Sequence, residues 1–210
     1  VTIDIEVKSE EGFPSPDSCS EEMLTISIQD YNTKHITTWG RKPYTPTQKN
    51  VTYHHYEEEV DMLRAFIDWW NQDPPEVVTG WNCRLYDIPY MCGRIDRIMG
   101  LKTLRQLSPW GLVNHSELYI NGRPHNIFDI VGVTTLDFME LYKKFTYVNR
   151  ESYRLDFIAE TELGQKKLDH SEFDTFKDFY TKDWKKFVDY NIVDVELVDR
   201  MEDKLRLIEL

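Results

Sequence analysis

Val1-Thr-Ile-Asp-Ile-Glu-Val7 is the stretch that decides the fold of this chain. Aliphatic and polar residues alternate strictly along it, which is the period of a β-strand with one buried face. Asp4 and Glu6 therefore stand on the same face, roughly 7 Å apart along the strand. Two such carboxylates repel each other unless a cation lies beside them, and Mg²⁺ and Mn²⁺ prefer oxygen ligands of this kind. A half-exposed strand with an acidic outer face explains the same pattern without a metal.

The composition indicates a folded, acidic protein. The chain has 210 residues, of which 40% are hydrophobic, enough for one large domain or two small ones with a sizeable core. A net charge of −12 argues against binding phosphates by charge alone. It does not argue against a metal-dependent phosphodiesterase, whose metals carry positive charge to the substrate. No apolar run approaches about 18 residues and no signal peptide is readable, so we expect no membrane association.

Cysteine and histidine usage predicts no metal site of those residue types. Cys19, Cys83 and Cys92 form no CxxC pair, so we expect reduced thiols in a cytoplasmic setting. His54 and His55 are adjacent in a predicted strand and would face opposite ways, which favours a structural or surface role.

Hydrophobic periodicity predicts one α/β domain over residues 1–210, without repeats or a linker. Residues 1–7, 23–30 and 35–39 predict three consecutive antiparallel strands. Further strands are expected at 51–56, 76–81 and 131–137, and helices at 57–72, 88–99, 136–145, 152–162, 173–180 and 182–208. Thr181 is the expected N-cap of the last helix. The Asn121-Gly122 pair predicts a β-hairpin at 117–128, inside an insertion at about 101–132.

Two later stretches carry further candidate site residues. Asn82, Tyr86 and Asp87 follow the buried strand at 76–81, and functional crevices of open α/β sheets lie at the carboxyl ends of strands. Tyr190 and Asp194 are four residues apart, so they share a face of the last helix outside its main apolar stripe. Taken singly, Asp87 also suits a helix cap and Tyr190 with Asp194 also suits an ordinary surface pair.

Taken in order, these stretches resemble the motifs of the DEDDy 3′–5′ exonucleases: Asp4-Ile-Glu6, Asn82-x-x-x-Tyr86-Asp87 and Tyr190-x-x-x-Asp194. More narrowly, the chain resembles the proofreading exonuclease domain of family B DNA polymerases. The flanks Gly12-Phe-Pro-Ser-Pro16, Leu141-Tyr-Lys-Lys-Phe145 and Ser152-Tyr-Arg-Leu-Asp-Phe-Ile-Ala-Glu160 are similar to T-even bacteriophage replicative polymerases, as is the hairpin insertion. The resemblance implies a ribonuclease H-like fold. Its mixed central sheet, antiparallel in the first three strands, is flanked by helices.

The resemblance also implies a reaction, the release of 5′-deoxynucleoside monophosphates from single-stranded or mispaired DNA 3′ ends. Two divalent metal ions, Mg²⁺ or Mn²⁺, are the implied cofactors. Asp4 is the expected ligand of both ions, and Glu6 and Asp194 complete the site of the ion that activates water. Asp87 is expected to hold the second ion, partly through water. The Tyr190 hydroxyl is expected to orient the attacking water and the phosphate.

DNA contacts are implied for residues outside the acidic group. Phe13 is the candidate for stacking on a base and Asn82 for contacting the terminal nucleotide, although Phe13 also suits loop packing. Asn121-Gly122 marks the expected tip of a hairpin that helps to separate primer from template. Four lysines are candidates for phosphate contacts, or simply solvated: Lys143, Lys144, Lys166 and Lys167.

The expected partners are DNA with a single-stranded 3′ end and a polymerase domain of the same or a sister polypeptide. The chain opens directly in a strand and lacks polymerase modules, which suggests an excised domain or one product of a split gene, acting in the cytoplasm of a phage-infected host. Two alternatives stay open: a non-catalytic nucleic-acid or protein-binding module, and a stand-alone DEDD exonuclease acting on RNA. The complete set of carboxylates and the tyrosine count against the first, and the phage-like flanks against the second.

Overall fold

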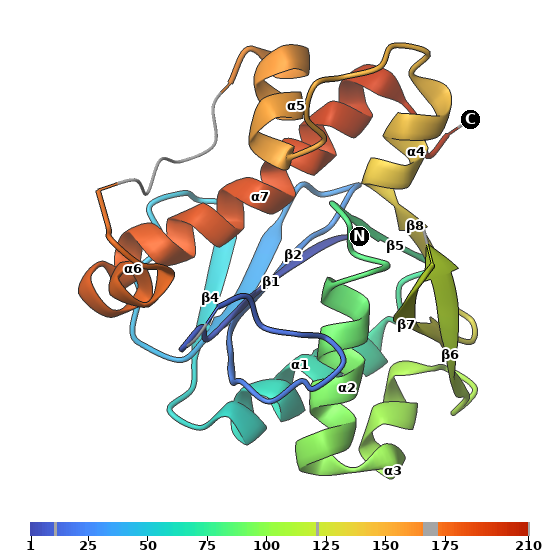
Figure 1. The fold of residues 1–210 in the computed structure, drawn as a ribbon. Coiled ribbons are helices and arrows are strands. Elements are labelled where there is room, and N and C mark those ends of the chain that lie inside the picture. Colours follow the sequence, from blue (N-terminus) through green and yellow to red (C-terminus); the bar gives the residue numbers. More distant parts are fainter. Residues whose placement is uncertain (11, 121, 166–171, 210) are drawn as a thin grey trace.

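A mixed β-sheet forms the centre of the molecule (Figure 1). The computed structural model describes residues 1–10, 12–120, 122–165 and 172–209. Within those ranges six strands form one sheet in the order β4-β3-β2-β1-β5-β8. Their bounds are β1 (Thr2–Val7), β2 (Met23–Gln29), β3 (Ile36–Gly40), β4 (Val51–His55), β5 (Val77–Gly80) and β8 (Thr134–Asp137). Strands β1, β2 and β3 pair antiparallel as predicted, whereas β3 with β4, β1 with β5, and β5 with β8 pair parallel.

Helices cover both faces of this sheet. Their bounds are α1 (Glu59–Gln72), α2 (Asp87–Met99), α3 (Leu101–Leu104), α4 (Phe138–Phe145), α5 (Leu155–Leu163), α6 (Phe176–Lys182) and α7 (Trp184–Leu205), with a 3₁₀ turn at Arg105–Leu107. Helix α7 crosses β1 and β2 on one face, while α1 and α2 pack on the other (Figure 1). The arrangement agrees with the predicted ribonuclease H-like architecture. Among the described residues, no helix combines the length and apolar character needed to span a membrane.

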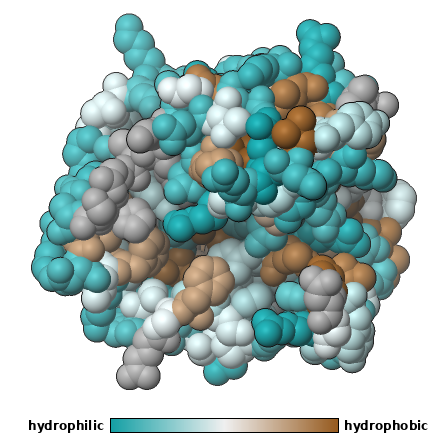
Figure 2. Space-filling model, turned by 45° about the horizontal axis from the view of Figure 1, so that its top comes forward, coloured by the Kyte–Doolittle hydropathy of each residue, from teal (hydrophilic) through white to brown (hydrophobic). Residues whose placement is uncertain are grey.

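Strand β1 divides its side chains between these two layers. Ile3, Ile5 and Val7 are buried in one core with the apolar residues of α1 and α2. The alternation sends Asp4 and Glu6 to the opposite face, which α7 covers. On the face shown in Figure 2 hydrophilic residues predominate, although a band of apolar residues crosses its middle.

The boundary between the last two helices differs from the prediction. Thr181 lies inside α6 and does not cap α7. Asp183 is the N-cap instead, because its side-chain oxygen accepts a hydrogen bond from the Lys186 N–H at 3.0 Å. A carboxylate at this position also interacts favourably with the positive end of the helix dipole.

The predicted hairpin is present and is longer than expected. Strands β6 (Val113–Ile120) and β7 (Arg123–Ile130) pair antiparallel over their whole length, apart from the main sheet. Gly122 adopts a positive φ of 76°, as a tight turn requires, while Asn121 lies outside the described residues. The Asn126 side chain donates to Asp17 Oδ1 at 2.6 Å and so fastens the hairpin to the loop that follows β1.

Candidate metal centre

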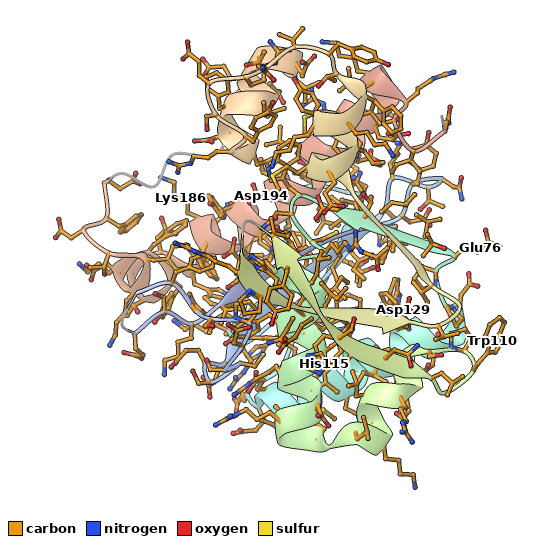
Figure 3. All side chains as sticks on the ribbon, turned by 45° about the vertical axis from the view of Figure 1, so that its right-hand side comes forward. Glu76, Trp110, His115, Asp129, Lys186 and Asp194 are labelled. Carbon is orange, nitrogen blue, oxygen red and sulfur yellow. The ribbon has the colours of Figure 1, made fainter. Side chains whose placement is uncertain are left out.

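Three carboxylates converge where α7 crosses β1. Asp4, Glu6 and Asp194 each offer one oxygen, and these oxygens all lie within 4.8 Å of one another. Figure 3 shows Asp194 on α7 in the middle of the molecule. It is only 4% exposed, which is at odds with the alternative of a surface pair. Anionic oxygens at this spacing repel each other and match the donor set that Mg²⁺ and Mn²⁺ prefer, so these residues fit a divalent cation.

Asp87 brings a fourth carboxyl group close to Asp4 and Glu6 on β1. Strand β5 ends at Gly80, and a Cβ there would lie 2.5 Å from the Ile3 carbonyl oxygen, so the two strands approach closely at this point. Past the end of β5, the backbone N–H of Ile5 on β1 donates a hydrogen bond to Asp87 Oδ1 at 3.0 Å. Asp87 thereby lies against the backbone between Asp4 and Glu6. Among the described residues, the group whose oxygens lie within 4.8 Å of one another consists of Asp4, Glu6 and Asp194 and does not include Asp87.

The environment of Asp87 favours its protonated form. Burial raises the pKa of this carboxyl group to about 7, and the nearby charges of Asp137 and Asp194 add to the effect. The hydrogen bond from the Ile5 N–H opposes it. A carboxyl group with this pKa at neutral pH becomes ionised readily when a cation is placed beside it.

Residues 81–86 connect β5 to α2 and are held in place by Asp137. Asn82 adopts a left-handed conformation with φ 62°, which Asn tolerates better than most residues. Its N–H and that of Arg84 donate to the Asp137 carboxylate at 3.2 and 3.0 Å. The same carboxylate caps α4 by accepting from the Met139 and Glu140 N–H groups. The sequence predicted no site role for Asp137, although an Asp directly before a helix is a recognisable cap signal.

Phe13 and Tyr86 form an aromatic pair beside the carboxyl groups. Phe13 is 79% exposed, and its ring centroid lies 4.9 Å from that of Tyr86. Burial raises the pKa of the Tyr86 phenol strongly, and the charges of Asp87, Glu6 and Asp4 raise it further. The Tyr86 phenol thus lies within the field of the acidic group, and Phe13 lies against its ring rather than in the core.

Tyr190 lies on α7 one turn before Asp194. It is buried, and the Phe179 ring packs edge-on against it at 5.6 Å. This contact with α6 fixes the tyrosine ring one helical turn before the carboxylate of Asp194.

Two of the four lysines considered as candidates for phosphate contacts lie over aromatic rings. The Lys143 ammonium group lies 4.8 Å from the Tyr153 ring centroid and that of Lys144 lies 5.4 Å from the Phe145 ring centroid. Lys166 and Lys167 lie outside the described residues.

Asn191 is a further residue at this site that the sequence did not indicate. Its side chain is completely buried on α7, and its amide nitrogen donates to Asp4 Oδ2 at 2.6 Å. A single Asn within a helix gives no signal along the chain, because its partner is 187 residues away.

Known proteins similar to this chain include viral DNA polymerases. Residues 1–158 match the family model described as DNA polymerase family B, exonuclease domain. A DNA-directed DNA polymerase of Escherichia phage RB69 is 28% identical over 232 aligned positions, covering 99% of this chain and 26% of the relative. One of Enterobacteria phage T4 is 33% identical over 156, covering 74% and 17%. A DNA polymerase of Autographa californica nuclear polyhedrosis virus is 26% identical over 172, covering 77% and 17%. The chain thus spans about a quarter or less of the length of these relatives.

Proposed function

The chain belongs to the exonuclease domain family of the family B DNA polymerases, and from that premise we propose that it is a metal-dependent 3′–5′ exodeoxyribonuclease. It removes 5′-deoxynucleoside monophosphates from single-stranded or mispaired 3′ ends, which is proofreading in DNA replication. The observation that carries this proposal is the convergence of Asp4, Glu6 and Asp194 from two distant parts of the sequence.

The proposed roles follow from the positions of the carboxyl groups. Two divalent ions, Mg²⁺ or Mn²⁺, when bound, supply an activated water and neutralise charge on the phosphate and the leaving oxygen. When ions are bound, Asp4 would contribute to both sites, and Glu6 and Asp194 would complete one of them. Asp87 would hold the other ion, partly through water, since its carboxyl group is held on the Ile5 amide beside the other three carboxylates.

Tyr190 and the neighbouring loops act on the substrate. The Tyr190 hydroxyl orients the attacking water and the scissile phosphate. Phe13 stacks on a base of the single-stranded 3′ end, and Asn82 contacts the terminal nucleotide, both from loops that flank the carboxyl groups.

The proposed partners extend beyond this chain. The relatives are polymerases several times its length, so we propose that the domain works with a polymerase domain that delivers the frayed 3′ end. That partner also supplies much of the positive charge for DNA binding, because this chain has a net charge of −12. The proposed setting is a phage-infected bacterial cell.

The test is degradation of a 5′-labelled single-stranded DNA oligonucleotide, followed on a gel with Mg²⁺, with Mn²⁺ and with chelator. We expect a ladder that shortens from the 3′ end only when metal is present. The double variant Asp4→Ala/Glu6→Ala should lose this activity while keeping its circular dichroism spectrum, because no pair of carboxylates remains on β1.

A matched control is the double variant Glu76→Ala/Asp129→Ala, which removes the same charge from positions outside the carboxylate group (Figure 3). It should retain activity. Degradation that persists in Asp4→Ala/Glu6→Ala would refute the assignment. A folded wild-type protein that stays inactive when a matching polymerase fragment is added would favour a binding module, and faster cleavage of an RNA oligonucleotide would favour an RNA exonuclease.

A further inference from the structure

A chain of buried hydrogen bonds runs from the middle of the sheet to the Asp4 carboxylate. The Thr38 and Ser27 hydroxyl oxygens lie 2.8 Å apart, and Ser27 Oγ lies 2.6 Å from Asn191 Oδ1. The amide nitrogen of Asn191 in turn lies 2.6 Å from Asp4 Oδ2. Thr38, Ser27 and Asn191 are all completely buried, so water does not compete for these bonds.

The donors in this chain all point the same way. A carboxylate only accepts, so the Asn191 side chain must present its NH₂ group to Asp4. Its carbonyl oxygen also only accepts, so the single Ser27 hydroxyl proton must be donated to Asn191. Thr38 must then donate to Ser27. The amide orientation is therefore fixed by chemistry, because reversing it would place the Asn191 carbonyl oxygen against the Asp4 carboxylate, and neither of these groups can donate.

Strand register explains why these groups meet. Asp4 on β1 pairs with Ser27 on β2, and Ser27 pairs with Thr38 on β3. The three side chains thus form one row across the sheet on the face covered by α7. Asn191 closes the row from above, and it lies on the same helix three residues before Asp194. One amide thereby ties the helix that carries the third carboxylate to the strand that carries the first two.

We propose that Asn191 is a positioning residue for the metal centre, and that Ser27 holds the Asn191 amide in its working orientation. This inference rests on the proposed function. The hydrogen bond restrains rotation of the Asp4 carboxylate and directs its remaining lone pairs toward Glu6 and Asp194, as partners behind a metal ligand do. The same hydrogen bond fixes the distance between α7 and β1, and therefore the spacing of the carboxylate oxygens of Asp4, Glu6 and Asp194.

The test is the affinity for Mn²⁺ measured by isothermal titration calorimetry without DNA. Asn191→Ala should weaken Mn²⁺ binding about 10- to 100-fold, the usual range when a partner of a metal ligand is removed. Ser27→Ala should weaken it less, because the amide stays next to Asp4 but loses its own support. In both variants the exonuclease rate should fall in parallel with metal affinity and recover in part at high Mn²⁺ concentration.

Gln29→Ala is the matched control. Gln29 also lies on β2, is buried, and donates its side-chain amide to a carboxylate on α7, that of Asp199, at 3.3 Å. Its removal should lower the unfolding temperature to a similar degree and leave Mn²⁺ affinity unchanged. A structural role alone would make Asn191→Ala and Gln29→Ala behave alike, and that result would overturn the inference.

The possible outcomes distinguish failure of the positioning role of Asn191 from failure of the proposed nuclease function. Tight Mn²⁺ binding by the wild type that Asp4→Ala abolishes, but that Asn191→Ala and Ser27→Ala leave unchanged, overturns the positioning role alone. Wild-type protein that binds no Mn²⁺ overturns both. If Asn191→Ala does not fold, Ser27→Ala still decides, because it retains the amide and removes only a hydroxyl group.

Discussion

Phe13 is the residue whose side chain the surrounding protein explains least. Its ring lies against Tyr86 but is 79% exposed, so packing gains little from an aromatic here. Phe13→Ala should weaken the binding of a single-stranded DNA oligonucleotide by about 1–3 kcal/mol, the usual contribution of one stacked base. Mn²⁺ affinity should be unchanged, since the carboxylates are untouched. Fluorescence anisotropy with a labelled oligonucleotide, with Ca²⁺ in place of Mg²⁺ to limit cleavage, measures the difference.

Trp110→Ala provides the control for this experiment. Trp110 is similarly exposed, at 71%, and lies at the edge of the molecule away from Asp194 (Figure 3). Its removal should leave DNA affinity unchanged. Equal losses of DNA affinity in the two variants would indicate nonspecific apolar binding. Unchanged DNA affinity in Phe13→Ala would show that Phe13 only packs within its loop.

Some candidate site residues could be predicted from the sequence, and others could not. Strand alternation made Asp4 and Glu6 candidates because it places both on one face, whereas Asp194 became a candidate only through the order of motifs that resembles the DEDDy exonucleases. Asn191 and Asp137 could not be predicted, because their roles depend on partners in other elements: Asp4 for one, and the amides of Asn82 and Arg84 for the other. Periodicity reports neighbours within one element and is silent on contacts between them.

Among the secondary-structure elements, the cap of α4 also supports the loop that carries two candidate site residues. Asp137→Ala removes four hydrogen bonds, two to α4 and two to residues 81–86. We expect a stability loss of about 1–2 kcal/mol, at the upper end for an N-cap. Exonuclease activity should fall as well, because the loop bearing Asn82 and leading to Asp87 loses its anchor. Urea unfolding and the gel assay measure the two effects separately.

Thr175→Ala is the comparison at the same scale. Thr175 caps α6 by accepting from the Asp178 N–H at 3.0 Å and has no contact with residues 81–86 among those described. It should cost a similar stability and leave activity intact. If both variants lose activity in proportion to their stability, Asp137 has no role beyond capping.

The bounds of elements with one buried face could be predicted from the sequence. The bounds of exposed elements, and of adjoining helices that pack on each other, were harder to predict. Strand β1 and helix α2 follow their periodic patterns closely. Hairpin strand β6 starts four residues earlier than predicted, because Asn114, His115 and Ser116 are all exposed and show no alternation of polar and apolar residues. At the start of α7, Thr181 and Asp183 both suit an N-cap, and only packing of α6 against α7 decides between them.

Considered as a whole molecule, the fold could be predicted in its order of elements but not in its strand neighbours. Turn signals predicted that β1, β2 and β3 follow one another antiparallel. That β5 lies on the other side of β1, and so brings Asp87 to Ile5, depends on the crossover connection from β4 through α1 to β5 over one face of the sheet. Short motifs in order therefore indicated the site, while its assembly depended on tertiary contacts between parts of the chain more than 80 residues apart.

A carboxylate shared by three segments makes the stability of the whole molecule depend on pH. Glu162 on α5 accepts from the Tyr142 hydroxyl of α4 at 2.6 Å, from Arg150 at 2.7 Å and from Lys204 of α7 at 3.1 Å. Burial raises the pKa of Glu162, but the hydrogen bonds from Tyr142 and Lys204 and the charges of Lys204 and Arg150 outweigh it, so the pKa lies below its ordinary value. The native state therefore binds this proton less readily than the unfolded chain does.

The sign of the pH dependence follows from that difference. The stabilisation is fully present above the ordinary pKa of 4.5 and is lost as the pH falls through the lowered native value. Glu162→Gln should thus reduce the free energy of unfolding at pH 7 by about 1.5–3 kcal/mol, the scale of a hydrogen bond to a charged group. The gap from the wild type should close as the pH falls through that lowered native pKa. Urea unfolding between pH 3 and 7 measures it, with the exposed hairpin variant Glu117→Gln expected to follow the wild type throughout. A gap of constant size at every pH would show that Glu162 acts through its shape rather than its charge.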